Sequence, residues 1–132
     1  MMTEQDYGLR IGTAGIPAST KPRSSKNGIK RLAELGLHCM ELEFVRSVQM
    51  GEKTATEVGQ VAKELDISLT AHAPYYVNLN SKEPEKIAAS KERVLKAARI
   101  GALAGARSVT FHAAYYHDDD PEQVYQAVKR HM

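Results

Sequence analysis

The chain has 132 residues, of which 42% are hydrophobic and 26% are charged, with one cysteine and no tryptophan. This length and hydrophobic content predict one domain that spans residues 1–132 and has a modest core. The 18 basic and 16 acidic side chains nearly cancel, so composition does not indicate a nucleic-acid binder. A single cysteine excludes a disulfide framework and a cysteine-rich zinc module. The lack of a long apolar run and of a signal segment predicts a cytoplasmic protein without membrane association.

Short extended runs alternate four times with longer stretches of helical periodicity. The predicted strands cover residues 8–13, 38–45, 67–72 and 108–112. The predicted helices cover residues 28–35, a segment that opens at Thr54, residues 85–104, and a last segment that runs from Asp120 to the chain end.

Capping residues mark the beginnings of two of these helices. Thr54, followed three residues later by Glu57, predicts a capping box at the start of the second helix. Asp120 and Pro121 predict the N-cap and the first residue of the last helix. Asp119, which precedes that N-cap, is expected to be solvated.

Four consecutive strand–helix units predict an α/β fold with a parallel sheet, because parallel strands need a crossover connection. The strands of an open, doubly wound sheet are buried on both faces and read as continuous apolar runs. Here each strand instead has one apolar face and one small or polar face. This alternation favours the first half of a (β/α)₈ barrel, with polar faces inside and helices outside. The polar faces consist of Arg10, Glu41, Glu43, Ser68, Thr70, His72, Ser108, Thr110 and His112.

The pattern Ser-x-Thr-x-His occurs twice, ending at His72 and at His112. Each histidine is the last residue of its predicted strand, which in a barrel is the mouth where active sites are built. Two imidazoles from adjacent strands predict a shared divalent metal such as zinc. The alternative is that each histidine caps its strand by a hydrogen bond to a loop carbonyl.

Two carboxylates lie on the polar face of the second strand. Glu43 is nearer the mouth and is the candidate general base, because carboxylates paired at a site can differ in pKa. Glu41 either joins it or forms an interior ion pair with Arg10. His38 is expected at the opposite, non-catalytic end of the sheet, and Cys39 is interpreted as a small buried hydrophobe.

The loops after the strands carry aromatic and basic side chains rather than glycine-rich phosphate cradles. Aromatic side chains on such loops can stack on bases, and Asn or Arg can reach phosphate oxygens. As a set these loops predict an anionic substrate. The alternative is that the tyrosines pack on the barrel rim and the cations are solvated. The loop residues concerned are Lys21, Arg23, Lys26, Arg46, Tyr75, Tyr76, Asn78, Tyr115, Tyr116 and His117.

The segment HAPYYVNLN resembles the first motif of the endonuclease IV family, the zinc-dependent apurinic/apyrimidinic endonucleases of base-excision repair. That motif reads His-x-x-Tyr, a hydrophobic pair, Asn, an apolar residue and a small residue. The matching residues are His72, Tyr75, Asn78 and Leu79, while Tyr76, Val77 and Asn80 depart from the motif. The segment VTFHAAYYH resembles the second histidine segment of the family through His112, and RIGTAGIP and MELEFVRSV resemble its earlier segments.

This resemblance implies a (β/α)₈ barrel with up to three zinc ions, or other divalent metals, at its mouth. It implies cleavage of the phosphodiester bond 5′ to an abasic site in double-stranded DNA, leaving a 3′-hydroxyl. Carried over residue by residue, His72 and His112 would be zinc ligands, and Tyr75 and Arg46 would contact DNA. Asn78, Tyr115 and Tyr116 are further candidates for DNA contacts.

Two alternatives remain. Metal-dependent sugar isomerases and epimerases share the same barrel superfamily, and fold alone does not separate them from the nuclease. The other alternative is an inactive, truncated half-barrel, because two histidines are fewer than the three protein ligands of a catalytic zinc. In that case we expect weak zinc binding, no cleavage of abasic DNA, and self-association through the open edges of the sheet.

Overall fold

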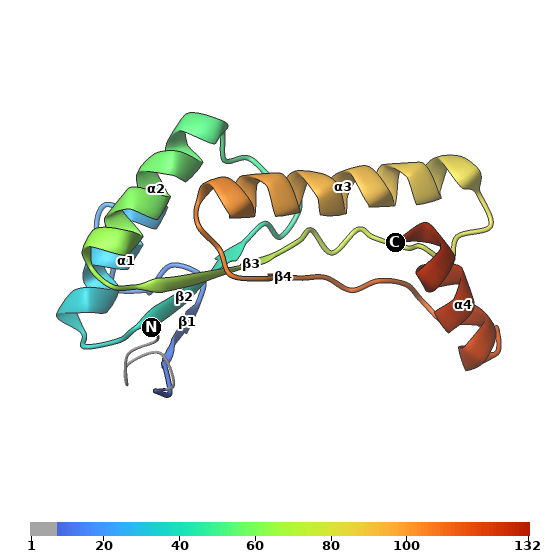
Figure 1. The fold of residues 1–132 in the computed structure, drawn as a ribbon, viewed down its shortest axis with the longest axis horizontal. Helices are drawn as coiled ribbons and strands as arrows, with labels where there is room; N and C mark the ends of the chain where they lie inside the picture. Colours follow the sequence, from blue (N-terminus) through green and yellow to red (C-terminus); the bar gives the residue numbers. More distant parts are fainter. Residues whose placement is uncertain (1–7) are drawn as a thin grey trace, which may run out of the picture.

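The computed structural model describes residues 8–132, in which four strands alternate with four helices (Figure 1). The predicted absence of a signal segment concerns the start of the chain, and residues 1–7 lie outside the described residues. The elements are β1 (Gly12–Ala14), α1 (Ser25–Glu34), β2 (Cys39–Glu43), α2 (Glu52–Glu64), β3 (Ser68–His72), α3 (Pro84–Leu103), β4 (Val109–Thr110) and α4 (Pro121–His131).

The four strands form one parallel sheet in the order β1-β2-β3-β4, which confirms the predicted succession of strand–helix units. The central pair is the longest, and it aligns Glu43 of β2 with His72 of β3. The outer strands are shorter than predicted, at three residues in β1 and two in β4. Each of them has a single hydrogen-bonded neighbour in the described sheet, so fewer backbone bonds extend its ladder.

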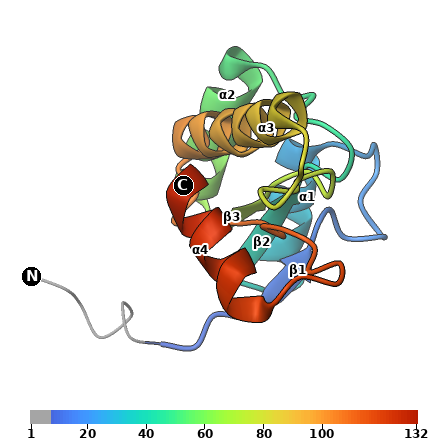
Figure 2. The same ribbon diagram turned by 90° about the vertical axis from the view of Figure 1, so that its right-hand side faces the viewer.

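One face of the sheet is covered and the other is not. Met40 and Leu42 of β2 and Leu69 and Ala71 of β3 are at most 4% exposed and belong to the main core. Figures 1 and 2 show α1, α2 and α3 on this side of the sheet. The alternate residues are half-buried or exposed. The predicted division into an apolar face under the helices and a polar face away from them is therefore confirmed.

Two predicted helix beginnings were wrong. Helix α1 begins three residues before Gly28, because the hydroxyl of Ser24 accepts a hydrogen bond from the Asn27 N–H and caps it. Helix α2 begins at Glu52 after the N-cap Gly51, so Thr54 lies within the helix and forms no capping box. The N-cap Asp120 of α4 is confirmed, because its carboxylate accepts hydrogen bonds from the backbone N–H groups of residues 122 and 123.

A second, smaller apolar cluster lies beyond the ends of β3 and β4. Val77 and Leu79, which follow β3, pack with Val94 of α3 and are at most 5% exposed. Val128 of α4 packs against the same cluster. This cluster anchors the loop that follows β3.

None of the helices among residues 8–132 is long and apolar enough to cross a membrane.

Candidate functional site

Three aromatic rings meet at the carboxyl ends of β3 and β4. The ring centroids of His72 and His112 are 5.1 Å apart, with an interplanar angle of 44°. Tyr75 completes a triangle, since its ring lies 5.4 Å from that of His72 and 5.8 Å from that of His112, edge-on to both. The predicted meeting of the two histidines at one end of the sheet is therefore confirmed.

The two histidines meet although they are not opposite each other in the ladder. The residue aligned with His72 is Thr110, two positions before His112. Residue 112 lies beyond the two-residue strand β4, in a segment from residue 111 to residue 120 that forms neither helix nor strand. Neighbouring parallel strands of a barrel are staggered, which accounts for this offset.

One nitrogen of His72 has a defined partner. Its Nδ1 lies 2.8 Å from the carbonyl oxygen of Ala73. A carbonyl only accepts hydrogen bonds, so Nδ1 is the donor in this contact, and in the neutral imidazole Nε2 then carries the lone pair. A neutral imidazole whose second nitrogen donates to a carbonyl is the usual state of a metal-binding histidine. For His72 the carbonyl hydrogen bond expected as the alternative to metal binding thus exists, and it is compatible with metal binding.

The two histidines are fewer than the ligands that a zinc site needs. Zinc is usually held by three or four protein ligands. Within residues 8–132, no group of three or more His, Cys, Asp or Glu side chains is placed to hold a metal ion. The two imidazoles fit zinc as two ligands of a larger donor set.

Glu43 of β2 is aligned with His72 in the sheet, but the β2 carboxylates form no metal-ligand group with the two histidines. The side chain of Glu43 lies against Gly15, where a methyl group in place of the glycine hydrogen would come within 3.0 Å of the Glu43 Oε2. Glu41 and Glu43 border a cavity of about 330 Å³ that Arg23 also lines. Glu43 is exposed and Glu41 half-buried.

The predicted alternative of an Arg10–Glu41 ion pair was wrong. The Arg10 guanidinium pairs with the Asp66 carboxylate at 3.1 Å and donates to the Asp66 carbonyl at 2.9 Å. Because β1 begins only at Gly12, Arg10 lies before the strand and beside the turn between α2 and β3.

Two further predictions concern the amino end of β2. His38 directly precedes that strand, at the end opposite the two clustered histidines, as expected. Cys39 was wrongly placed in the core. It is half-buried, because it alternates with the buried Met40, and its thiol donates to the Arg10 carbonyl at 3.6 Å.

The loops after the strands present exposed aromatic and basic side chains. The side chains of Tyr76, Tyr115 and Tyr116 are 63%, 58% and 61% exposed, so packing on the rim does not describe them. Arg46 is also exposed. Lys26 was wrongly assigned to a loop at the mouth, since it lies in α1 and pairs with Glu57 of α2 at 2.7 Å.

Asn78 connects the loops that follow β3 and β4. Its Oδ1 accepts hydrogen bonds from the N–H groups of Asn80 and Tyr115, at 3.1 and 3.3 Å. Its Nδ2 lies 3.4 Å from Nε2 of His117. The carboxamide that the motif predicts for DNA contact is therefore engaged within the protein.

Two residues that connect these loops were missed from the sequence. Asn80, 7% exposed, donates through Nδ2 to the Tyr115 carbonyl at 3.1 Å and to the Asp119 carboxylate at 2.9 Å. Asp119 was predicted to be solvated, but it also pairs with Lys82 at 2.9 Å. The hydrogen bonds from Lys82 and then Asn80 hold the pKa of Asp119 below its ordinary value. Nothing in an acidic run distinguishes the member that finds such partners.

Residues 29–132 match the sequence profile of a family described as Xylose isomerase-like TIM barrel. An uncharacterized protein of Methanocaldococcus jannaschii is 36% identical over 124 residues, which cover 94% of this chain and 44% of that protein. The chain therefore spans less than half the length of this curated relative.

Three solved structures share the fold. Endonuclease IV from Thermus thermophilus superposes with a TM-score of 0.64 at 17% identity, over 89% of this chain and 43% of that one. D-psicose 3-epimerase from Clostridium cellulolyticum, solved with D-tagatose, superposes with a TM-score of 0.67 at 15% identity, over 83% of this chain and 40% of that one. SacUVDE superposes with a TM-score of 0.64 at 15% identity, over 81% of this chain and 41% of that one. At such identities the likeness shows the fold alone.

Proposed function

The chain belongs to the xylose isomerase-like TIM barrel family, and we propose that within this family it forms part of a zinc-dependent endonuclease acting on abasic sites in DNA base-excision repair. The observation that carries the proposal is the triangle of His72, Tyr75 and His112. It joins two potential metal ligands to an aromatic ring at the place where barrel enzymes build their active sites.

His72 and His112 are the residues that would hold zinc, through the nitrogens not engaged with the protein. Bound zinc would lower the pKa of a coordinated water and stabilise charge on the attacked phosphate. The Ala73 carbonyl orients the His72 ring by accepting from its Nδ1. Glu43 is the carboxylate that we assign as general base, a role for which its exposure leaves it available.

The exposed loop residues suit a distorted nucleic acid. Tyr75 is 44% exposed and edge-on to both histidines, so its free face can stack on a base beside the gap left by an abasic site. Tyr115 and Tyr116 present further aromatic surface on the neighbouring loop. Arg46 extends from the loop after β2 and is free to contact a phosphate. Asn78 would act indirectly on DNA binding, because its Oδ1 accepts hydrogen bonds from Asn80 and Tyr115 and so connects the two loops.

A metal-dependent sugar epimerase is the second candidate. It is favoured by the superposition on D-psicose 3-epimerase, which is as good as that on endonuclease IV. Four tyrosines near one end of the sheet are exposed, and open aromatic surface suits stacking on bases, which favours the nuclease.

Binding to a short duplex separates the candidates. We expect the chain, with Zn²⁺, to bind a duplex containing one tetrahydrofuran abasic residue more tightly than the same intact duplex, by fluorescence anisotropy. Tyr75→Ala should reduce that preference about tenfold, since stacking on an aromatic ring contributes roughly 1–3 kcal/mol. Tyr125→Ala, at an exposed tyrosine on α4, is the matched control. Equal binding of both duplexes, together with binding of D-tagatose, would favour the epimerase.

A further inference from the structure

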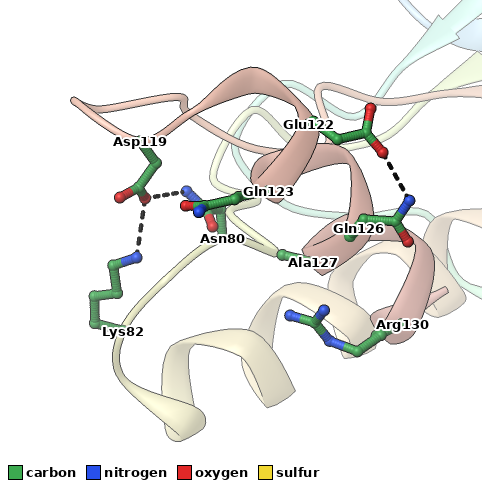
Figure 3. Close-up of a pocket in the computed structure, with 8 residues that line it drawn as sticks. All are labelled: Asn80, Lys82, Asp119, Glu122, Gln123, Gln126, Ala127 and Arg130. Carbon is green, nitrogen blue, oxygen red and sulfur yellow. Dashed lines mark hydrogen bonds and ion pairs between the residues drawn. The ribbon is translucent and has the colours of Figure 1, made fainter.

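The loops after β3 and β4 are joined by a network of side chains, which we call the loop latch: Asn80, Lys82 and Asp119. Figure 3 shows the Asp119 carboxylate between the Lys82 ammonium and the Asn80 amide. Both protons of the Asn80 amide are used, one on the Tyr115 carbonyl and one on Asp119. A buried amide with both donors satisfied fixes two chain segments relative to each other.

The latch continues the pairing of the two strands past their ends. The Leu79 N–H donates to the Ala113 carbonyl at 2.9 Å, and the Tyr115 N–H donates to Asn78 Oδ1. The Asn80 amide then donates to the carbonyl of the same tyrosine. Tyr115 is thus held at both its N–H and its carbonyl by side chains of the neighbouring loop.

The loop after β4 has few other means of holding its shape. Strand β4 is two residues long, and the segment from residue 111 to residue 116 has no regular structure. His117 adopts a left-handed backbone conformation with φ of 53°, which is uncommon for residues other than glycine. His112 lies at the base of this loop and Tyr115 and Tyr116 along it.

From these contacts we propose that Asn80 is a positioning residue, which through Tyr115 and Asp119 sets the orientation of the loop that carries His112, Tyr115 and Tyr116. Position 80 is one at which the sequence departs from the small residue of the motif described above. The existence of the latch follows from its hydrogen bonds alone. Its role in holding the tyrosines against DNA rests on the proposed function.

A cavity of about 390 Å³ borders the latch on the side of α4, lined by Asn80, Lys82, Asp119 and Arg130 among others. None of the three clustered rings lines it (Figure 3). The latch residues therefore lie beside a cavity that is separate from the ring triangle.

Amide hydrogen exchange of the whole chain, followed by NMR, tests the latch. In Asn80→Ala we expect the Tyr115 and Asp119 amides to exchange about tenfold faster than in the wild type. The Ala71 amide, which donates to Ser108 in the core of the sheet, should keep its rate. Asp119→Asn, at a half-buried position outside the two core clusters, should show a smaller acceleration at Tyr115. Gln126→Ala, which removes a separate contact with Glu122 beside the same cavity, should show none.

The latch would be contradicted if the exchange rate of the Tyr115 amide in Asn80→Ala were unchanged, or if the rates of Tyr115 and Ala71 rose equally. The second arm measures the preference for the abasic over the intact duplex in the same variants. If the wild type has a preference, Asn80→Ala should reduce it at least threefold and Gln126→Ala should not. A preference retained in Asn80→Ala would overturn the positioning role. A wild type without any preference contradicts the proposed function, and the exchange data then still decide the latch.

Discussion

His72 Nδ1 lies 2.8 Å from the carbonyl oxygen of Ala73, while the ring of His72 lies 5.1 Å from that of His112. The first contact makes Nδ1 the hydrogen-bond donor of the ring, and the second places another imidazole next to that ring. This relationship joins the end of one strand to the loop after the next, and it underlies the proposed metal site.

Removal of either histidine should weaken metal binding. We expect His72→Ala and His112→Ala each to raise the Kd for Co²⁺ or Zn²⁺ at least about tenfold, since even loss of a residue that only supports a ligand costs roughly 10–100-fold. Isothermal titration calorimetry measures this. His38→Ala is the matched control, because His38 lies at the other end of the sheet. Equal loss in all three variants would show that the metal binds elsewhere.

The two faces of β3 should respond differently to truncation. Leu69→Ala removes a side chain that is 2% exposed in the main core, so we expect a loss of about 2–5 kcal/mol in the free energy of unfolding. Thr70→Ala, on the uncovered face of the same strand, should cost less than about 1 kcal/mol. Urea unfolding of both variants compares these values. Equal costs would contradict the division of the sheet into a covered and an uncovered face.

The uncovered face and the sheet edges should promote self-association. Within the described sheet, β1 and β4 each pair on one side only, and unpaired strand edges are templates for a second chain. We expect sedimentation velocity to show a concentration-dependent dimer. Ile11→Glu, at a 58% exposed side chain beside β1, should weaken the dimer, whereas Leu103→Glu on α3 should not. A monomer at every concentration would contradict this expectation.

Acid should remove the contribution of Asp119 to stability. Lys82 first and Asn80 second lower the pKa of the Asp119 carboxyl in the folded chain, with a smaller effect from the charge of His117. A carboxyl with a lowered folded pKa stabilises the fold above its unfolded pKa, and the contribution is lost as the pH falls through the folded pKa. Below about pH 4, urea unfolding should therefore show a steeper loss of stability in the wild type than in Asp119→Asn. Parallel pH profiles would contradict the interaction.

Local patterns predicted the sheet and its faces. Alternation over residues 68–72 follows from the two-residue period of a strand, so it separated Leu69 from Thr70 and put His72 at the strand end. The predicted start of α2 was wrong because the Thr54–Glu57 pattern is only one of several ways to begin a helix. Here Gly51 is the N-cap and the helix begins at Glu52.

Contacts that depend on the shapes of the loops could not be predicted in this way. Arg10 and Asp66 are 56 positions apart, and Asn80 and Asp119 are 39 apart. Both pairs depend on loop conformations that no periodicity encodes. Asn80 therefore appeared in the sequence only as a departure from a motif, although it is buried between two loops in the fold.

The most direct test of the proposed function is whether zinc controls recognition of the abasic site. The dissociation constants for the abasic and the intact duplex would be measured by anisotropy, first with Zn²⁺ and then after chelation, in the wild type and in His72→Ala. We predict that the wild type prefers the abasic duplex with zinc, and that chelation or His72→Ala abolishes the preference. Equal affinities for the two duplexes with zinc, or a preference that survives both chelation and His72→Ala, would contradict the proposal.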